Sequence, residues 1–122
     1  MDLPIRANRK DRASILGTAK RQLSPARRAF LQLMQAINFG RIEKLRIVKG
    51  EPLLDPRPII VREIKLGGEN GPRTELSLDD FLLKKEVVEL FAFFDEFRDG
   101  VIDVIEVRHG LPCRVIVREG DA

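Results

Sequence analysis

The chain is poor in residues that support redox and metal chemistry: it has one cysteine and one histidine among 122 residues, and no tryptophan or tyrosine. The single cysteine, Cys113, excludes an intramolecular disulfide, and with His109 alone it cannot supply the ligands of a structural zinc site. His109 precedes a glycine, where histidine tolerates turn geometry, and it has no evident nucleophile beside it. We therefore expect a non-enzymatic protein with no cofactor, no metal and no evident small-molecule substrate.

Long apolar runs are also missing. The longest, Leu90–Phe94, has five residues, whereas a bilayer-spanning helix needs about 20 and a signal-peptide core about 7 to 15. Hydrophobic residues make up 43% of the chain and charged residues 34%, which suits one folded domain and argues against a wholly disordered chain. These features predict a reduced, cytoplasmic protein that does not contact a membrane.

Positive charge is concentrated at the N-terminus. Residues 1–28 contain eight basic and two acidic residues, whereas residues 29–122 contain 14 basic and 17 acidic residues. A basic arm, residues 1–23, on a mildly acidic body is typical of proteins that contact polyanions, although such a segment can also be only a solvated leader or a short helix capped by Asp11. The residues that we assign here to nucleic-acid binding are Arg9, Lys10, Arg12, Lys20, Arg21, Arg27 and Arg28.

Two segments of the chain resemble each other at a constant separation of 60 residues. Residues 40–52 and 100–112 both begin with glycine, carry aliphatic residues at matching positions, and end with glycine followed two residues later by proline. Further along, residues 59–63 match residues 115–119 at a separation of 56, so the first copy has four additional residues in a proline-containing loop. Such self-similarity predicts a duplicated structural unit.

Each copy opens with a predicted helix. Ser24 and Pro25 form a typical helix start, a hydroxyl cap followed by proline at the first helical position. In the second copy, Ser77 with Asp80 resembles a capping box for a helix over residues 77–97. The glycines that follow these helices are expected to end them in the left-handed conformation, and they are Gly40 and Gly100.

After each glycine the apolar pattern changes to period two, which indicates strands. His109–Gly110 is typical of a two-residue hairpin turn, and Lys49–Gly50 is its expected counterpart with a longer return loop. The order helix, strand, strand, repeated once, predicts an α+β domain with a four-stranded, mainly antiparallel sheet, both helices on one face and a permuted ferredoxin-like order. The domain covers residues 24–122, and its two repeats cover residues 24–66 and 77–119.

The repeat also predicts which side chains share a face of the sheet, because a shift of one residue would invert every side chain. Cys113 and eight aliphatic residues are expected to face the helices: Leu45, Ile47, Ile59, Val61, Ile105, Val107, Val115 and Val117. The opposite face would carry six basic residues and one acidic residue among ten: Lys44, Arg46, Ile60, Arg62, Val104, Glu106, Arg108, Arg114, Ile116 and Arg118.

Arginine suits contact with a phosphate backbone, because its planar fork gives paired hydrogen bonds to phosphate oxygens. The absence of aromatic residues from this predicted face favours contact with a duplex backbone over stacking of single-stranded bases. The alternative is a solvated or partner-facing sheet in which the arginine stems cover aliphatic neighbours. The arginines that we assign to nucleic-acid binding on this face are Arg46, Arg62, Arg108, Arg114 and Arg118.

The second helix, residues 77–97, is apolar on more than one side, which predicts burial on more than one side. The second contact is the first helix, residues 11–23 or another copy of the protein. We favour a homodimer, because an exposed phenylalanine patch would be a liability and small oligomers are usually twofold symmetric. The interface residues that we expect are Val88, Phe93 and Phe97.

These patterns predict a small non-enzymatic protein that contacts nucleic acid through its arm and its arginine-rich sheet face. The rival hypothesis is a protein–protein interaction or assembly module that self-associates through the phenylalanine-rich helix. An enzyme would require a pocket that gathers His109, Cys113 or several carboxylates.

Overall fold

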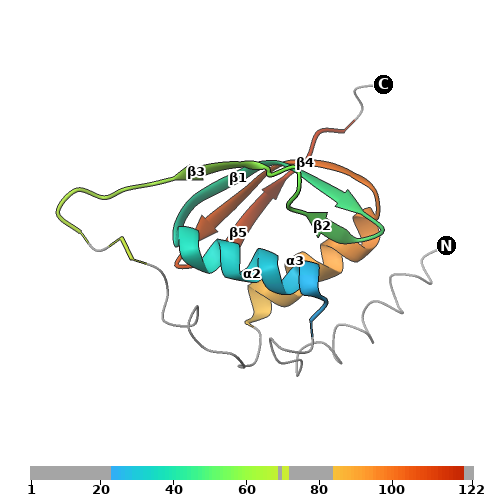
Figure 1. Ribbon diagram of the computed structural model, residues 1–122, viewed down its shortest axis with the longest axis horizontal. Helices are drawn as coiled ribbons and strands as arrows, with labels where there is room; N and C mark the ends of the chain where they lie inside the picture. Colours follow the sequence, from blue (N-terminus) through green and yellow to red (C-terminus); the bar gives the residue numbers. More distant parts are fainter. Residues whose placement is uncertain (1–22, 69, 72–83, 120–122) are drawn as a thin grey trace.

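The computed structural model describes residues 23–68, 70–71 and 84–119 (Figure 1). The predicted basic arm, apart from Leu23, and the predicted cap at Ser77 and Asp80 lie outside the described residues. The elements, in chain order, are α2 (Pro25–Ile37), β1 (Phe39–Val48), β2 (Glu51–Leu53), β3 (Ile59–Arg62), α3 (Lys85–Phe97), β4 (Gly100–Arg108) and β5 (Leu111–Ile116).

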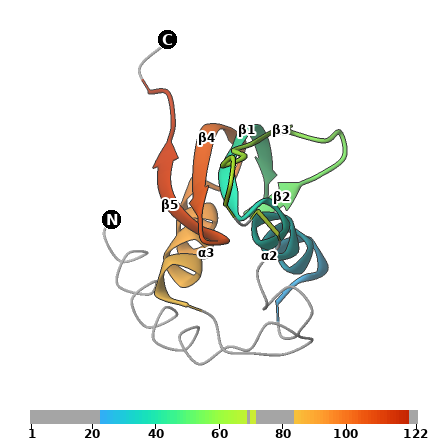
Figure 2. The same cartoon turned by 90° about the vertical axis from the view of Figure 1, so that its left-hand side faces the viewer.

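The strands form one five-stranded antiparallel sheet in the order β2-β1-β4-β5, and β3 pairs with β1 as well. β2 and β3 lie one after the other along the same edge of β1, because the loop of residues 54–58 separates them. Both helices cover the same face of the sheet (Figures 1 and 2). The predicted α+β class is confirmed, with five strands in place of the four predicted.

The strand order differs from the one predicted. β1 and β4, the strands that follow the two helices, pair with each other along their length at the centre of the sheet. In a permuted ferredoxin-like sheet the strand after each helix would lie at an edge. The predicted ferredoxin-like order is therefore wrong, because the register joins the two post-helical strands directly.

The start of α2 follows from its sequence. The Ser24 hydroxyl oxygen accepts a hydrogen bond from the Arg27 amide at 3.2 Å, and Pro25 occupies the first turn, where its missing amide hydrogen costs nothing. Asn38 caps the end of the helix; it has a φ of 65° and donates its amide hydrogen to the Met34 carbonyl oxygen at 3.0 Å. The residue that ends the helix is therefore Asn38, where Gly40 was expected.

α3 begins later than the sequence predicts. Lys84 has an extended backbone, with a ψ of 158°, and makes no side-chain cap, so the helix begins at Lys85 and does not run continuously from Ser77. It ends at Arg98, which has a φ of 66° and donates its amide hydrogen to the Phe94 carbonyl oxygen at 3.0 Å. Arg98 thus takes the role expected of Gly100.

Gly40 and Gly100 are required for close packing. A Cβ atom at Gly40 would lie 2.1 Å from the Val61 carbonyl oxygen of β3, and one at Gly100 would lie 2.9 Å from the Phe97 ring. Real Cβ atoms do not approach backbone oxygens so closely. These glycines therefore allow β3 to pair beside β1 and the Phe97 ring to fold back over the start of β4.

The two hairpin turns have the same form. Lys49 and Gly50 have φ values of 54° and 81°, and His109 and Gly110 have values of 56° and 74°, as a two-residue hairpin turn with both central residues at positive φ requires. The Gly50 amide donates to the Arg98 carbonyl oxygen at 2.8 Å, and the Gly110 amide donates to the Asn38 carbonyl oxygen at 2.9 Å. The first turn is thus bonded to the end of α3, and the second turn is bonded to the end of α2.

The core lies between the helices and the inner face of β1 and β4. Phe30 of α2 and Phe94 of α3 meet edge to face, with ring centroids 5.7 Å apart, a favoured arrangement for aromatic pairs. The fully buried large side chains are Phe30, Leu31, Met34, Ile42, Leu45, Ile47, Val87, Phe91, Phe94, Ile102 and Ile105. Neither helix in the described ranges is long and apolar enough to cross a membrane.

Alternation along β1 is interrupted at Lys44, which has a φ of 58°. Ile42 and Leu45 are both fully buried although they are three residues apart, so the residues before and after Lys44 alternate in opposite phase. The same spacing recurs in β4, where Ile102 and Ile105 are both fully buried. Before Lys44 the even-numbered residues of β1 therefore face the core, whereas after Lys44 the odd-numbered residues do. Alternation read from Leu45 and Ile47 does not predict this change.

This change of phase inverts β3 relative to the prediction. Ile60 lies opposite the buried Ile42 and packs against the core, whereas Ile59 is 52% exposed. Val61 lies opposite the exposed Arg41, and Arg62 lies on the core side of β3 at its end. The faces predicted for Ile59, Ile60, Val61 and Arg62 are wrong, while those predicted for Leu45, Ile47, Ile105 and Val107 are confirmed.

Cys113 is the extra residue of an irregularity between β4 and β5. Arg114 lies opposite Glu106 and Pro112 lies opposite Val107, so Cys113 has no partner in β4. Its side chain is exposed, and its sulfur lies 3.5 Å from the Glu106 carbonyl oxygen. The predicted inward orientation of Cys113 is wrong, because the bulge changes the phase of β5 at this point.

Candidate functional site

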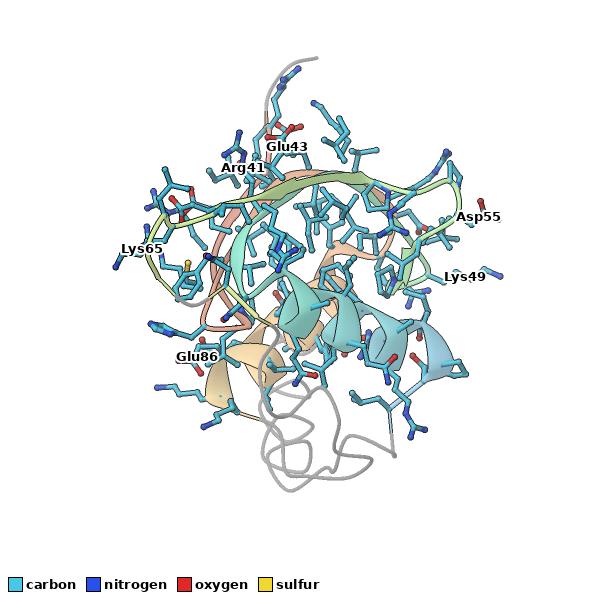
Figure 3. All side chains as sticks on the ribbon, turned by 60° about the vertical axis from the view of Figure 1, so that its left-hand side comes forward. Arg41, Glu43, Lys49, Asp55, Lys65 and Glu86 are labelled. Carbon is cyan, nitrogen blue, oxygen red and sulfur yellow. The ribbon has the colours of Figure 1, made fainter. Side chains whose placement is uncertain are left out.

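The outer face, the face of the sheet turned away from both helices, carries charged and aliphatic side chains together. Arg41 and Glu43 extend from β1 on this side in Figure 3. Its basic residues are Arg41, Lys44, Arg46, Arg108 and Arg114, with Arg118 just beyond β5, and its acidic residues are Glu43, Asp103 and Glu106. Six basic and three acidic residues give a positive but mixed surface, less cationic than the sequence predicted.

Three of the arginines on the outer face each pair with an acidic residue through one nitrogen. The three pairs join arginine Nε to a carboxylate oxygen: Arg41 to Glu43 at 2.6 Å, Arg114 to Glu106 at 3.3 Å and Arg118 to Asp103 at 3.6 Å. A guanidinium has four further N–H donors on its two terminal nitrogens. The acids therefore orient the arginines through Nε, and the terminal nitrogens lie at the far end of side chains that are about half exposed or more.

Asp103 lies between two cations. Its Oδ1 atom accepts a hydrogen bond from the Lys44 ammonium at 3.0 Å, and its Oδ2 atom lies 3.6 Å from Arg118 Nε. The hydrogen bond from Lys44 and the positive charges of Lys44 and Arg118 lower the pKa of Asp103 below its usual value of 3.8, against a smaller opposing effect of desolvation. Asp103 is thus held ionised, and it joins β1, β4 and the segment after β5.

Two further arginines and three exposed aliphatic side chains also lie on the outer face. Within the described part of the chain, no acidic residue pairs with Arg46 or Arg108. Ile59, Val101 and Ile116 are 52%, 49% and 41% exposed. The face therefore offers free guanidinium groups next to partly exposed apolar surface.

Arg27, which the sequence placed among the nucleic-acid ligands, is part of the protein interior. Its side chain is 13% exposed, and its guanidinium donates to the Gly50 carbonyl oxygen at 2.9 Å, pairs with Asp95 and lies over the Phe91 ring at 5.3 Å from the centroid. These contacts tie α2 to the first hairpin turn and to α3. Arg27 is not available to a ligand in this arrangement.

The other predicted phosphate ligands are only partly brought together. Arg46, Arg108 and Arg114 lie on the outer face and Arg118 beside it, whereas Arg28 is half-buried on α2. Arg62 lies in β3 and donates to the Asn70 carbonyl oxygen at 2.7 Å. The predicted ligands that lie outside the described residues are Arg9, Lys10, Arg12, Lys20 and Arg21.

The predicted dimer residues are not equally accessible. Val88 is 1% exposed and belongs to the protomer core. Phe93 and Phe97 are half-buried and stack on each other, with ring centroids 5.6 Å apart. Phe93 also lines a shallow groove between α3 and β5, together with Cys113 and Arg114. The homodimer stays a prediction, and Phe93 and Phe97 are the residues that could carry it.

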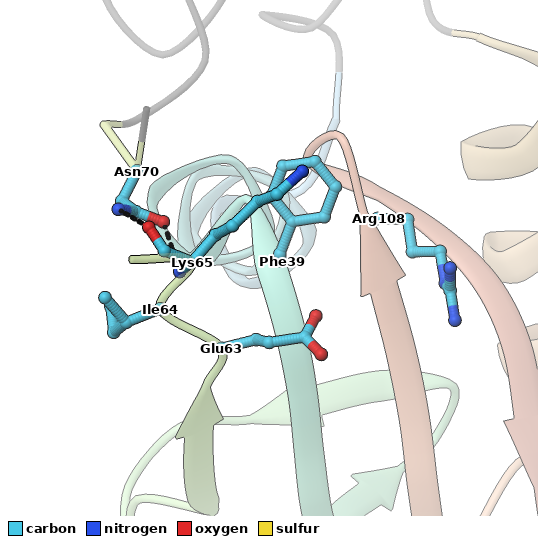
Figure 4. A pocket seen from close by; sticks show the side chains of 6 residues that line it. All are labelled: Phe39, Glu63, Ile64, Lys65, Asn70 and Arg108. Carbon is cyan, nitrogen blue, oxygen red and sulfur yellow. Dashed lines mark hydrogen bonds between the residues drawn. The ribbon is translucent and has the colours of Figure 1, made fainter. Parts of the chain in front are cut away.

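Phe39 is a candidate residue that the sequence analysis missed. It begins β1 and lines a hollow of about 460 Å³ at the end of the sheet, together with Glu63, Ile64, Lys65, Asn70 and Arg108 (Figure 4). A second hollow of about 290 Å³ shares Glu63 and Arg108 and extends along the outer face to Arg41. No sequence signal marks Phe39, because the alternation that places Leu45 and Ile47 inward also places Phe39 inward unless the phase changes at Lys44.

Among the described residues no group of histidine, cysteine or carboxylate side chains could hold a metal ion. No family model, no curated protein and no solved structure matches the chain. Its function must therefore be inferred from the surfaces described above.

The ionisation of Asp103 gives a direct test of the outer-face network. Because the pKa of Asp103 is lowered in the folded protein, its interactions stabilise the fold above the usual value of 3.8 and are lost as the pH falls through the lowered pKa. Lys44→Met is expected to raise the pKa of Asp103 toward its usual value, and Arg118→Met to raise it less. Carbon-13 NMR titration of the carboxyl group measures both shifts. Lys65→Met, at the end of the sheet, serves as the control, and an Asp103 pKa that Lys44→Met leaves unchanged would contradict the pairing.

Proposed function

We propose that the protein binds nucleic acid, with the outer face contacting phosphates and the N-terminal arm adding to the attraction. The observation that carries this proposal is the arrangement of the arginines. Arg46 and Arg108 have no acidic partner in the described part of the chain, and Arg41 and Arg114 contact acids through Nε alone. Guanidinium groups held in this way can offer their terminal N–H pairs to phosphate oxygens.

The acidic residues limit how strong this binding can be. An exposed ion pair contributes about 0 to 1 kcal/mol, so a phosphate can compete with Glu43 or Glu106 for an arginine. The carboxylates nevertheless repel phosphates, and a mixed face is expected to bind more weakly than a uniformly cationic one. We therefore expect weak, non-specific affinity that depends strongly on salt.

The arm supplies the remaining positive charge. Of the eight basic residues in positions 1–28, Arg27 is held inside the protein, and most of the others precede α2. A cationic segment joined to a binding surface raises its affinity for a polyanion mainly through long-range attraction. The arm is expected to strengthen binding without adding sequence specificity.

We also propose that the chain is a duplicated helix–strand–strand unit. α2 and α3 have 13 residues each and begin 60 residues apart. Ile42 matches Ile102 and Leu45 matches Ile105 in the repeat, and the register pairs Ile42 with Ile105 and Leu45 with Ile102, so an exchange of the two copies turns one pair into the other. The duplication places arginines of both copies, Arg46 and Arg108 among them, on one face.

Charge reversal on the outer face tests the proposed binding. The double variant Arg46→Glu, Arg108→Glu is expected to weaken binding to a fluorescein-labelled DNA about tenfold or more at low salt, because two phosphate contacts become repulsive. The slope of log affinity against log salt is expected to fall in magnitude by about 2. Fluorescence anisotropy at several salt concentrations measures both quantities.

A matched control distinguishes an effect of the outer face from an effect of the protein's net charge. The double variant Arg57→Glu, Lys85→Glu makes the same change in net charge at exposed positions outside the strands, and it is expected to weaken binding far less. If the wild-type protein shows no binding at micromolar concentration and low salt, or if the two double variants weaken binding equally, the proposal is wrong.

A homodimer is the second candidate, and the edge of the sheet favours it. β5 lies at the end of the strand order, and no described strand pairs with its free edge. An unpaired edge is a template for another strand, and the adjacent groove exposes part of Phe93. Two protomers joined antiparallel at β5 would form a continuous sheet with a shared outer face.

Cys113 can report such a dimer without any engineering, because it is the single cysteine, it is exposed and it lies in β5. A short bismaleimide is expected to link two chains through Cys113, giving a species at twice the chain mass of 13.9 kDa on a denaturing gel. Cys113→Ser is expected to abolish this species, and Phe93→Glu to reduce it. A monomeric mass by light scattering at about 100 µM protein, a concentration well above typical specific dissociation constants, would rule the dimer out.

A further inference from the structure

The hollow at the end of the sheet points to a more specific ligand. Phe39 forms part of its wall, and the His109 ring meets the Phe39 ring edge to face, with centroids 4.8 Å apart. The Glu63 amide donates to the Phe39 carbonyl oxygen at 2.8 Å, which fixes the segment after β3 beside the ring. The aromatic surface is therefore held in place by the turn on one side and by this segment on the other.

The far wall of the hollow is also ordered by hydrogen bonds. The Asn70 side chain accepts a hydrogen bond from the Lys65 amide at 2.9 Å and donates one to the Lys65 carbonyl oxygen at 3.1 Å, as the dashed lines in Figure 4 show. Arg62 adds a hydrogen bond to the Asn70 carbonyl oxygen at 2.7 Å. In this view the Lys65 side chain extends toward the Phe39 ring, and Arg108 lies on the opposite side.

The side chains that line the hollow indicate which kind of ligand fits it. An aromatic ring flanked by cationic side chains suits a planar group that carries phosphate nearby. Glu63, whose carboxylate also lines the hollow, disfavours a bare anion inside it but can accept hydrogen bonds from the amino groups of a nucleobase. A neutral base in the hollow with its phosphate toward Arg108 or Lys65 satisfies all of these groups.

We infer that this hollow binds one unstacked base of a single-stranded nucleic acid, an inference that rests on the proposed binding of phosphates by the outer face. In a duplex the faces of the bases are stacked and cannot reach an aromatic side chain, whereas single strands present them freely. The second hollow shares Glu63 and Arg108 with the first and continues to Arg41. A strand that inserts a base beside Phe39 can therefore continue along the arginines of the outer face.

The absence of tryptophan and tyrosine from the chain makes a clean experiment possible. Phe39→Trp places a single fluorescent indole in the hollow, and Phe97→Trp places one on α3 as the matched control. A single-stranded oligonucleotide of about 12 nucleotides, within the range of known site sizes, is expected to quench the indole of the Phe39→Trp variant strongly and that of the Phe97→Trp variant little. The same strand without bases and the same sequence as a duplex are expected to leave both variants unquenched.

The second measurement is the affinity of the protein for each nucleic acid, and its first comparison uses the wild-type protein alone. The wild-type protein is expected to bind the single strand about fivefold or more tighter than the duplex or the abasic strand, as loss of one stacked base predicts. Phe39→Leu is expected to remove most of this preference and to leave duplex affinity within about twofold, because phosphate contacts remain. Circular dichroism and thermal unfolding check that the variants are folded.

The outcomes separate the two proposals. Equal affinity of the wild-type protein for single strand, abasic strand and duplex, with the indole of the Phe39→Trp variant unquenched, would overturn the base-binding inference and leave phosphate binding by the outer face intact. No binding of any of the three at low salt would overturn both. If adenosine monophosphate quenches the indole of the Phe39→Trp variant at the same concentration at which the single strand does, the hollow binds a free nucleotide. That result would overturn the single-strand inference.

Discussion

Two reciprocal hydrogen bonds determine how the halves of this sheet meet. The amide of Gly50 in the first hairpin turn bonds to the end of α3 at Arg98, and the amide of Gly110 in the second turn bonds to the end of α2 at Asn38. Asn38 and Arg98 each end a helix, with φ values of 65° and 66°. Each turn amide bonds to a carbonyl group that has no partner within its helix. The two bonds fix each turn against the start of the opposite strand, and this sets the register of β1 against β4. That register determines the spacing of the charged residues on the outer face.

Much of this architecture could be predicted from the sequence, because it depends on local signals. Ser24–Pro25 marks the start of α2, and the glycines at 50 and 110 mark turns whose φ values demand them. The faces of residues beyond Lys44 follow from period-two alternation. The left-handed conformation of Lys44 has no such signal, since lysine rarely adopts it.

The main error on the outer face is the inversion of β3, and it has one cause. In the second copy, Val115 of β5 pairs with Ile105 of β4. If the first copy were the same, Ile59, the match of Val115, would pair with Leu45, the match of Ile105. Ile59 pairs instead with Glu43, two residues earlier in β1. The change of phase at Lys44 falls within that interval, so β3 presents the opposite face from the one its sequence match in β5 predicts. Arg62 consequently leaves the outer face. Acidic side chains that the sequence assigned to no face, Glu43 and Asp103, join it beside the arginines.

The most direct test is amide hydrogen exchange at the two turn glycines. If the reciprocal bonds hold the hairpins to the helix ends, the Gly50 and Gly110 amides exchange as slowly as the central β1 and β4 amides, through opening of the whole domain. The Gly68 amide, which bonds to Lys65 at 3.1 Å within an exposed loop, provides the fast-exchanging reference. Exchange of Gly50 and Gly110 at the rate of Gly68 would contradict this account.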